Sequence, residues 1–188
     1  MKPTIIQTIR IGPEPKIAVN YAGAGPAVVF LHGIGGNKGN WTGAINALSP
    51  RFLAMAWDAR GYHESDDYDG ILRDEDFVSD LLKVLDHFKI EKAHIVGLSM
   101  GVEIAIDFHD KHPERVKSLV FCDGSTGDEV NAKEYLEAYL QSRLAPLKAG
   151  IEMKDVVQDW VPSLIADNSS KAVTKEATKS LLVLRKES

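Results

Sequence analysis

Short apolar runs alternate with amphipathic stretches through residues 1–124, and this alternation predicts strands separated by helices. A continuous run such as Ala27–Leu31 is typical of a strand that is buried on both faces of a sheet. The predicted strands cover residues 5–11, 16–21, 27–31, 52–57, 94–98 and 116–122. Helices between successive strands are typical of an α/β protein with a mostly parallel sheet.

Apolar residues at helical spacing mark the segments between these strands. Within residues 74–89 they fall on one helical face, and three acidic residues place negative charge where that helix would begin. A second amphipathic run follows residue 99 and ends at Pro113, which cannot continue a helix. A shorter helix is predicted near residues 41–48. The sheet is therefore expected to be flanked by helices.

The pattern changes after Gly124. Residues 129–188 contain no convincing strand, and helical runs are predicted near residues 129–148, 153–166 and 170–186. We therefore expect two parts, an α/β core of residues 1–124 and a helical segment of residues 125–188 laid over that core.

The composition is typical of a soluble globular protein, with 44% hydrophobic and 26% charged residues among 188. The net charge is −5, and scattered lysines and arginines give no reason to expect nucleic acid or a membrane as partner. No apolar run approaches the ~20 residues that span a bilayer, and the N-terminus does not resemble a signal peptide. The single cysteine, Cys122, excludes an internal disulfide and is expected to be a buried thiol. These features predict a soluble, cytoplasmic protein.

The strongest chemical signal is the segment Gly97–Gly101, with the sequence GLSMG. It lies at a predicted strand-to-helix junction, where a tight turn lifts the hydroxyl of Ser99 clear of the sheet and glycines allow close packing. The N-terminus of the following helix offers unpaired N–H groups to a negatively charged oxygen. Ser99 is therefore the predicted nucleophile.

A glycine-rich loop, His32–Gly36, follows the buried strand at residues 27–31. If Ser99 attacks a carbonyl group, the N–H groups of Met100 and Ile34 are the expected donors to the oxyanion. The loop lacks the glycine spacing of nucleotide-binding motifs, and no histidine, cysteine or carboxylate spacing predicts a metal site. Neither a cofactor nor a metal is expected.

These motifs resemble those of the α/β-hydrolase superfamily, in particular its capped esterases, enol-lactonases and carbon–carbon hydrolases. The residues that carry the resemblance stand in family order and are His32–Gly36, Trp41, Asp58–Gly61, Ser65-Asp66, Gly97–Gly101 and Pro113–Val116. The resemblance implies that Ser99 is the nucleophile on a nucleophile elbow, and that Ile34 and Met100 form the oxyanion hole. It also implies that residues 125–188 are the cap and that the substrate is a small molecule.

Two departures from the family pattern can reshape the pocket. Val102 stands where relatives often have a second glycine. Where relatives often show Arg-Gly-x-Gly-x-Ser, the segment Arg60–Ser65 contains His63 and Glu64. Neither change removes a chemical group that acyl transfer needs.

The base that should activate Ser99 is missing from its usual place. In this superfamily the chain order is serine, acid, histidine, but no histidine follows His112. His63 is the only histidine with an interesting expected position, in a loop at the carboxyl edge of the sheet. Asp123 follows a predicted strand where some relatives place the triad acid. Without the last strands of the family fold, residues 116–122 are expected to form an exposed sheet edge.

The sequence leaves three interpretations open. The first is a serine hydrolase of carboxylesterase or lactonase type that cleaves a small carboxylic ester, lactone or related carbonyl compound through an acyl-enzyme. In that case the chain is truncated, and the triad histidine comes from a missing part. The second is a non-catalytic ligand-binding protein on the same scaffold. The third is a homodimer that pairs through the exposed sheet edge, although identical copies would not restore the histidine.

Overall fold

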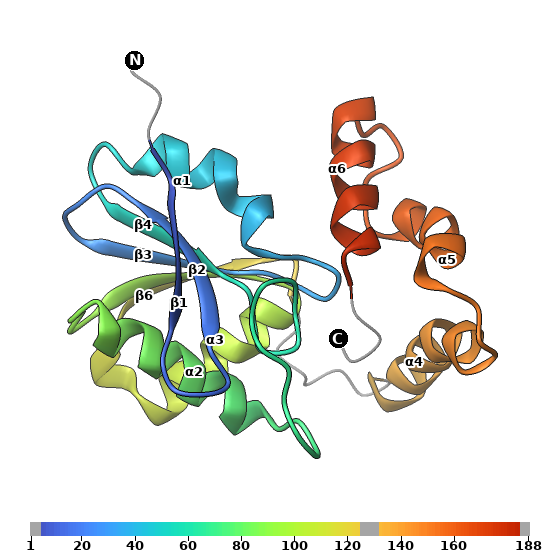
Figure 1. The fold of residues 1–188 in the computed structure, drawn as a ribbon, viewed down its shortest axis with the longest axis horizontal. Coiled ribbons are helices and arrows are strands. Elements are labelled where there is room, and N and C mark those ends of the chain that lie inside the picture. The colour runs from blue at the N-terminus through green and yellow to red at the C-terminus, as the bar shows by residue number, and fades with distance from the viewer. Residues whose placement is uncertain (1–4, 125–131, 185–188) are drawn as a thin grey trace. The chain divides into compact units, whose positions relative to one another are not determined.

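A computed structural model describes residues 5–124 and 132–184 of the protein (Figure 1). The chain divides into two compact units, one containing residues 5–124 and the other containing residues 132–184.

The first unit is built on a six-stranded sheet with the strand order β1-β2-β4-β3-β5-β6. Its strands are β1 (Gln7–Ile11), β2 (Ile17–Ala22), β3 (Ala27–Leu31), β4 (Leu53–Trp57), β5 (Ala93–Leu98) and β6 (Val116–Cys122). From β4 through β3 and β5 to β6 the neighbours are parallel, whereas β2 pairs antiparallel with both β1 and β4. All six predicted strands and the mostly parallel sheet are confirmed, with boundaries that move by one or two residues.

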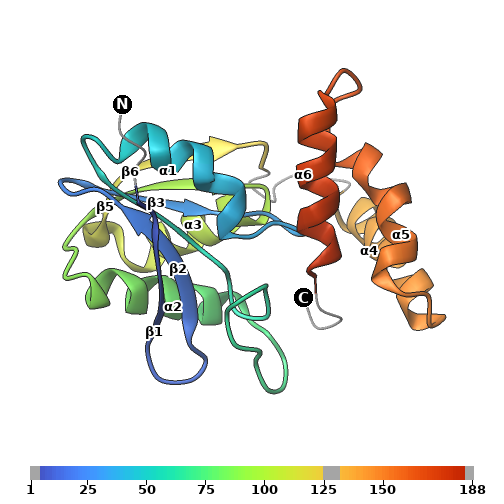
Figure 2. The same cartoon turned by 45° about the horizontal axis from the view of Figure 1, so that its top comes forward.

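Helices cover both faces of this sheet, as Figures 1 and 2 show. The helical elements of the unit are η1 (Lys38–Trp41), α1 (Thr42–Leu48), α2 (Asp74–His87), α3 (Met100–Lys111) and η2 (Pro113–Arg115). Helix α1 lies on one face, while α2 and α3 lie together on the other (Figure 2). Because successive strand residues point to opposite faces, Phe30 packs with Ile45 of α1 while Leu31 faces the opposite way. Strand β3 therefore buries apolar residues on both faces of the sheet.

The second unit is helical in its described part. It contains α4 (Ala132–Lys148), α5 (Met153–Trp160), η3 (Val161–Ser163) and α6 (Lys171–Leu182), which confirms the three predicted helical runs. The middle helix is shorter than predicted and gives way to a 3-10 turn containing Pro162, which has no N–H for an α-helical bond. The small apolar core of the second unit contains Val157, Val161 and Leu181. No helix in the described ranges has both the length and the apolar content needed to cross a bilayer.

Strand β6 is the last strand of the sheet and pairs only with β5 among the described strands. Its side chains are largely accessible, with Val120 and Phe121 exposed by 47% and 48%. The expected exposed edge is confirmed. Cys122, expected to be buried, is only half-buried, because it sits on this edge strand.

We expect the β6 edge to promote self-association, because an unpaired strand can add to the sheet of a second molecule. Replacing Val120 by lysine should weaken any such association about tenfold or more by placing charge on the edge. Sedimentation velocity over a range of protein concentrations measures the effect. Ile71→Lys is the control, because Ile71 is 80% exposed in a loop away from the sheet edge. A wild-type protein that stays monomeric throughout would contradict the homodimer.

Candidate active site

Ser99 lies on the turn between β5 and α3, as its motif predicts. Its backbone has φ 52° and ψ −120°, a left-handed conformation that residues with a side chain adopt at an energetic cost. Two backbone hydrogen bonds hold the turn. The Ser99 N–H donates to the Cys122 carbonyl at 3.0 Å, and the Val102 N–H donates to the Ser99 carbonyl at 2.7 Å. The side chain of Ser99 is exposed, so a substrate can reach its hydroxyl.

The two flanking glycines are required by close backbone packing. A Cβ atom at Gly97 would come closer than 3.0 Å to the Gly101 carbonyl, and one at Gly101 would meet the Leu31 carbonyl equally closely. Backbone atoms cannot move aside as a flexible side chain can. These glycines therefore let α3 start directly against β5 and β3, which places Ser99 at the carboxyl edge of the sheet.

The glycine-rich loop after β3 lies beside this serine. A Cβ atom at Gly33 would be 2.9 Å from the Ser99 Cβ and 3.5 Å from its Oγ. The next residue, Ile34, points an exposed side chain outward. Within residues 5–124, neither the Ile34 nor the Met100 N–H donates to a backbone carbonyl. Both amides are therefore available to a ligand, and their role as the oxyanion hole remains a prediction.

His32 is a buried, neutral part of this loop. Its Nε2 accepts a hydrogen bond from the Ala59 N–H at 3.0 Å, so Nδ1 carries the proton and donates to the Gly33 carbonyl at 2.8 Å. Burial lowers the pKa of His32, although the hydrogen bond to Gly33 opposes this effect. Because both ring nitrogens are engaged, His32 shapes the loop and is not free to serve as a base for Ser99.

His32 should make the fold less stable in acid. Its ordinary pKa is 6.5 and burial lowers the folded value, so the unfolded chain binds more protons as the pH falls below about 6.5. The free energy of unfolding should therefore rise with pH up to about 6.5, by at most about 1.4 kcal/mol per pH unit for one proton. The nearby charges of Asp58, Lys38 and His63 modulate the folded value.

Urea unfolding of the wild type and His32→Gln between about pH 5 and pH 8 tests this expectation. The difference in slope between the two proteins isolates His32 from the carboxylates, which titrate in both. Equal slopes would show that His32 carries no such linkage.

The other candidates for the triad do not lie at Ser99. The Ser99 hydroxyl makes no hydrogen bond to a histidine within the described ranges, 5–124 and 132–184. His63 instead places Nδ1 3.2 Å from the carboxylate of Asp58. Asp123 follows β6 directly, is exposed and adopts φ 48°. Among the described residues, none of these candidates lies in position to act as a base for Ser99.

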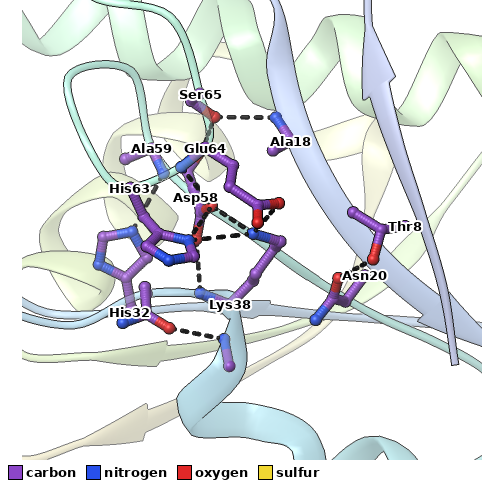
Figure 3. A network of polar contacts seen from close by, with 12 residues as sticks. Thr8, Ala18, Asn20, His32, Lys38, Asp58, Ala59, His63, Glu64 and Ser65 are labelled. Atoms are coloured by element: carbon purple, nitrogen blue, oxygen red, sulfur yellow. Dashed lines mark hydrogen bonds and ion pairs between the residues drawn. The ribbon is translucent and has the colours of Figure 1, made fainter. Parts of the chain in front are cut away.

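A partly buried polar network joins Lys38 to the loop that follows β4 (Figure 3). The Asp58 side chain is fully buried and the Lys38 side chain is only 4% exposed. The Lys38 ammonium lies 2.7 Å from the Asp58 carboxylate, 2.8 Å from the Glu64 carboxylate and 3.2 Å from His63 Nδ1. Asp58 also accepts hydrogen bonds from the backbone N–H groups of Lys38 and Glu64.

Sequence reasoning missed this network. Asp58, His63 and Glu64 bring their ligand atoms within 4.8 Å of one another, as metal ligands would. No metal spacing motif marks them, and a lysine after a glycine-rich loop gives no sign of being buried. The ammonium of Lys38 already supplies the positive charge that a metal ion would bring to these groups.

Further contacts fix the loop that follows β4. Arg60 forms two hydrogen bonds to the buried Asp80 of α2, at 2.6 and 2.9 Å. The Ser65 hydroxyl donates to the Asp58 carbonyl at 2.6 Å and accepts from the Ala18 N–H at 2.8 Å. This part of the chain is therefore rigidly attached to both the sheet and α2.

Both departures from the family pattern have a local explanation. His63 keeps a left-handed backbone with φ 43°, the conformation that glycine adopts easily, and uses its ring to contact Asp58. Val102 is 1% exposed, and a Cβ atom at Gly124 would come closer than 3.0 Å to its side chain. The valine thus occupies space that a glycine after β6 leaves open.

Comparison with known proteins agrees with this architecture. Residues 26–150 match the model of the alpha/beta hydrolase fold family. The chain is 36% identical over 140 residues to an uncharacterised protein of Mycobacterium tuberculosis, which covers 72% of this chain and 38% of that protein. It is 33% identical over 98 residues to 3-oxoadipate enol-lactonase 1 of Acinetobacter baylyi, which covers 52% of this chain and 36% of the lactonase.

A solved structure, that of a thermophilic esterase from Thermogutta terrifontis, matches the fold with a TM-score of 0.78. The two sequences are 24% identical, and the match covers 97% of this chain and 68% of the esterase. Because the family model covers more than half of its residues, the chain belongs to the α/β-hydrolase fold family. It spans well under half the length of the two curated relatives.

Proposed function

We propose that the protein is a serine hydrolase of the carboxylesterase or lactonase type. Ser99 attacks the carbonyl carbon of a small carboxylic ester, lactone or related compound and forms an acyl-enzyme. The N–H groups of Ile34 and Met100 hold the negative charge that develops on the carbonyl oxygen. Water then releases the acid and regenerates Ser99.

The backbone of Ser99 is the observation that carries this proposal. A serine held at φ 52° and ψ −120°, exposed at the start of a helix and beside a glycine-rich loop, has the backbone arrangement of a nucleophile elbow. Family membership supports hydrolysis in general, and the enol-lactonase among the relatives supports a carbonyl substrate.

The base is the part that the described residues do not supply. We propose that a histidine outside this chain relays the proton, since the relatives are longer than the matched region. The intact mass of the polypeptide in its natural source tests this point. A mass well above that of 188 residues would direct the search for the acid and histidine to the additional part.

A non-catalytic ligand-binding protein on the same scaffold is the second candidate. The observation that favours it is the absence of a hydrogen bond from any described histidine to the Ser99 hydroxyl. Such a protein would bind its ligand equally well after Ser99→Ala and would turn over no ester. The cytoplasmic location expected from the sequence stays a prediction.

Labelling with a fluorophosphonate distinguishes the two candidates. Loss of a triad histidine costs roughly 10⁶ in kcat, but roughly 10³–10⁴ over water remains from the oxyanion hole and binding. We therefore expect slow labelling that peptide mass mapping places on Ser99 and that Ser99→Ala abolishes. Ser142→Ala is the matched control, because Ser142 is an exposed serine on α4. Equal labelling of Ser99 and Ser142 would refute the hydrolase.

A further inference from the structure

We propose that Lys38 is a positioning residue whose buried ammonium acts as an internal cation and fixes the loop that carries the Ile34 N–H. The inference rests on the proposed function, because it assigns to that amide the role of oxyanion donor. It adds a group on which the geometry of the oxyanion hole depends and whose own contacts are with Asp58, His63 and Glu64.

The loop is anchored at both ends to two consecutive residues. At the start of the loop, His32 Nε2 accepts from the Ala59 N–H at 3.0 Å. After the loop, the Lys38 N–H and its ammonium both donate to the Asp58 carboxylate at 2.7 Å. Ile34 therefore lies on a short segment whose two ends are attached to the carboxyl end of β4.

The anchor at Lys38 depends on charge. Asp58 is completely buried, and a buried carboxylate is stable only when a positive group and hydrogen-bond donors surround it. Lys38 supplies that positive group and also contacts Glu64 and His63, both from the loop that follows β4 (Figure 3). The Lys38 ammonium thus links the glycine-rich loop to three side chains of the loop that follows β4.

The position of the ammonium is that of a metal ion in a small site. Asp58, His63 and Glu64 form the only group of potential metal ligands in the described part of the chain, and Lys38 contacts all three. Unlike a bound metal ion, Lys38 is covalently continuous with the glycine-rich loop. Its ammonium therefore holds the loop itself as well as the ligand atoms. Removing the side chain would leave three ligand atoms without a cation.

The catalytic consequence follows from the distance dependence of hydrogen bonding. An oxyanion donor is effective only when its hydrogen bond reaches the position of the developing charge, and losing one donor costs roughly 10²–10³ in kcat. If Lys38 no longer held the loop, Ile34 would sample positions in which its N–H misses that oxygen. Met100 would be unaffected, because α3 holds it.

The experiment compares Lys38→Ala with Lys111→Ala, a control in which the lost lysine forms an ion pair with Glu75 on the surface. Hydrogen exchange reports the freedom of residues 33–37, and fluorophosphonate labelling reports the reactivity of Ser99. In Lys38→Ala we expect the exchange of residues 33–37 to be about tenfold faster and labelling about 10- to 100-fold slower. Lys111→Ala should match the wild type in both measurements.

Metal rescue gives a readout that a merely structural lysine would not produce. Added Zn²⁺ should bind between Asp58, His63 and Glu64 in Lys38→Ala and slow the exchange of residues 33–37 towards the wild-type rate. The same addition should leave the wild type and Lys38→Ala/His63→Ala unchanged. Absence of rescue would overturn the internal-cation assignment.

The outcomes separate this inference from the proposed function. Unchanged exchange of residues 33–37 in Lys38→Ala overturns the inference whether or not Ser99 reacts. Faster exchange together with an unreactive Ser99 in the wild type supports the anchor and refutes the hydrolase. If Lys38→Ala does not fold, Glu64→Ala replaces it. The Glu64 side chain is 53% exposed, and its substitution removes only one contact of the Lys38 ammonium. Exchange of residues 33–37 should then rise about two- to fivefold, and no rise would overturn the inference.

Discussion

Replacement of Asp58 by alanine is expected to lower the free energy of unfolding by about 3–5 kcal/mol, because it leaves a buried lysine without its main counter-charge. Asp58 accepts hydrogen bonds from the Lys38 ammonium and from the backbone N–H groups of Lys38 and Glu64. The substitution would remove the acceptor of the two backbone N–H groups and would leave the ammonium with only Glu64 and His63 as partners. Urea unfolding at neutral pH, followed by circular dichroism, measures the loss.

Two variants show whether the loss comes from the buried charge. Asp58→Asn keeps an oxygen acceptor of the same shape and should be less damaging than Asp58→Ala, while still weakening the pair with Lys38. Glu75→Ala removes the exposed partner of Lys111 and should change stability little. Comparable effects from Asp58→Ala and Glu75→Ala would show that the network in Figure 3 contributes no more than a surface ion pair.

Replacement of Gly101 by alanine should be nearly as damaging, with a loss of about 3 kcal/mol or more. A methyl group at this position would overlap the carbonyl of Leu31 and crowd that of His32, so α3 would have to move away from β3. Because α3 begins immediately after Ser99, the same movement would shift Ser99. Thermal unfolding measures the loss of stability, and fluorophosphonate labelling measures the displacement of Ser99.

Gly43→Ala provides a closely matched control. Gly43 is the second residue of α1, as Gly101 is the second residue of α3, but nothing lies within 4 Å of the Cβ that it would gain. Because alanine has a higher helix propensity than glycine, Gly43→Ala should raise the free energy of unfolding by about 0.5–1 kcal/mol. If Gly43→Ala and Gly101→Ala lowered the free energy of unfolding by similar amounts, close packing at Gly101 would not be the cause of its loss.

The fold was accessible from the sequence because local patterns and the sheet architecture agree. The apolar run at Ala27–Leu31 is buried on both faces, and the helix predicted after Ser99 begins at Met100. The main differences are at the ends of elements, where capping and proline decide the boundary. The helices between successive strands were also predicted, because parallel strands need crossover connections.

The site was accessible only where chemistry is carried by a local motif. Gly97–Gly101 predicted a turn with an exposed serine, and the structure places Gly33 beside that serine. The buried pair of Lys38 and Asp58 joins residues twenty positions apart, and no local pattern signals such a contact. The left-handed backbone of His63 was equally hidden, since it depends on contacts with Asp58 and Lys38.

The packing of Val102 against Gly124 has an evolutionary consequence. The two positions lie on different elements but fill one common volume at the end of β6. A homologue with glycine after the nucleophile motif has room for a side chain beyond the strand, whereas one with a β-branched residue there needs glycine beyond the strand. The residues at positions 102 and 124 should therefore covary across the family. Each homologue should have a larger side chain at one of these positions and glycine at the other.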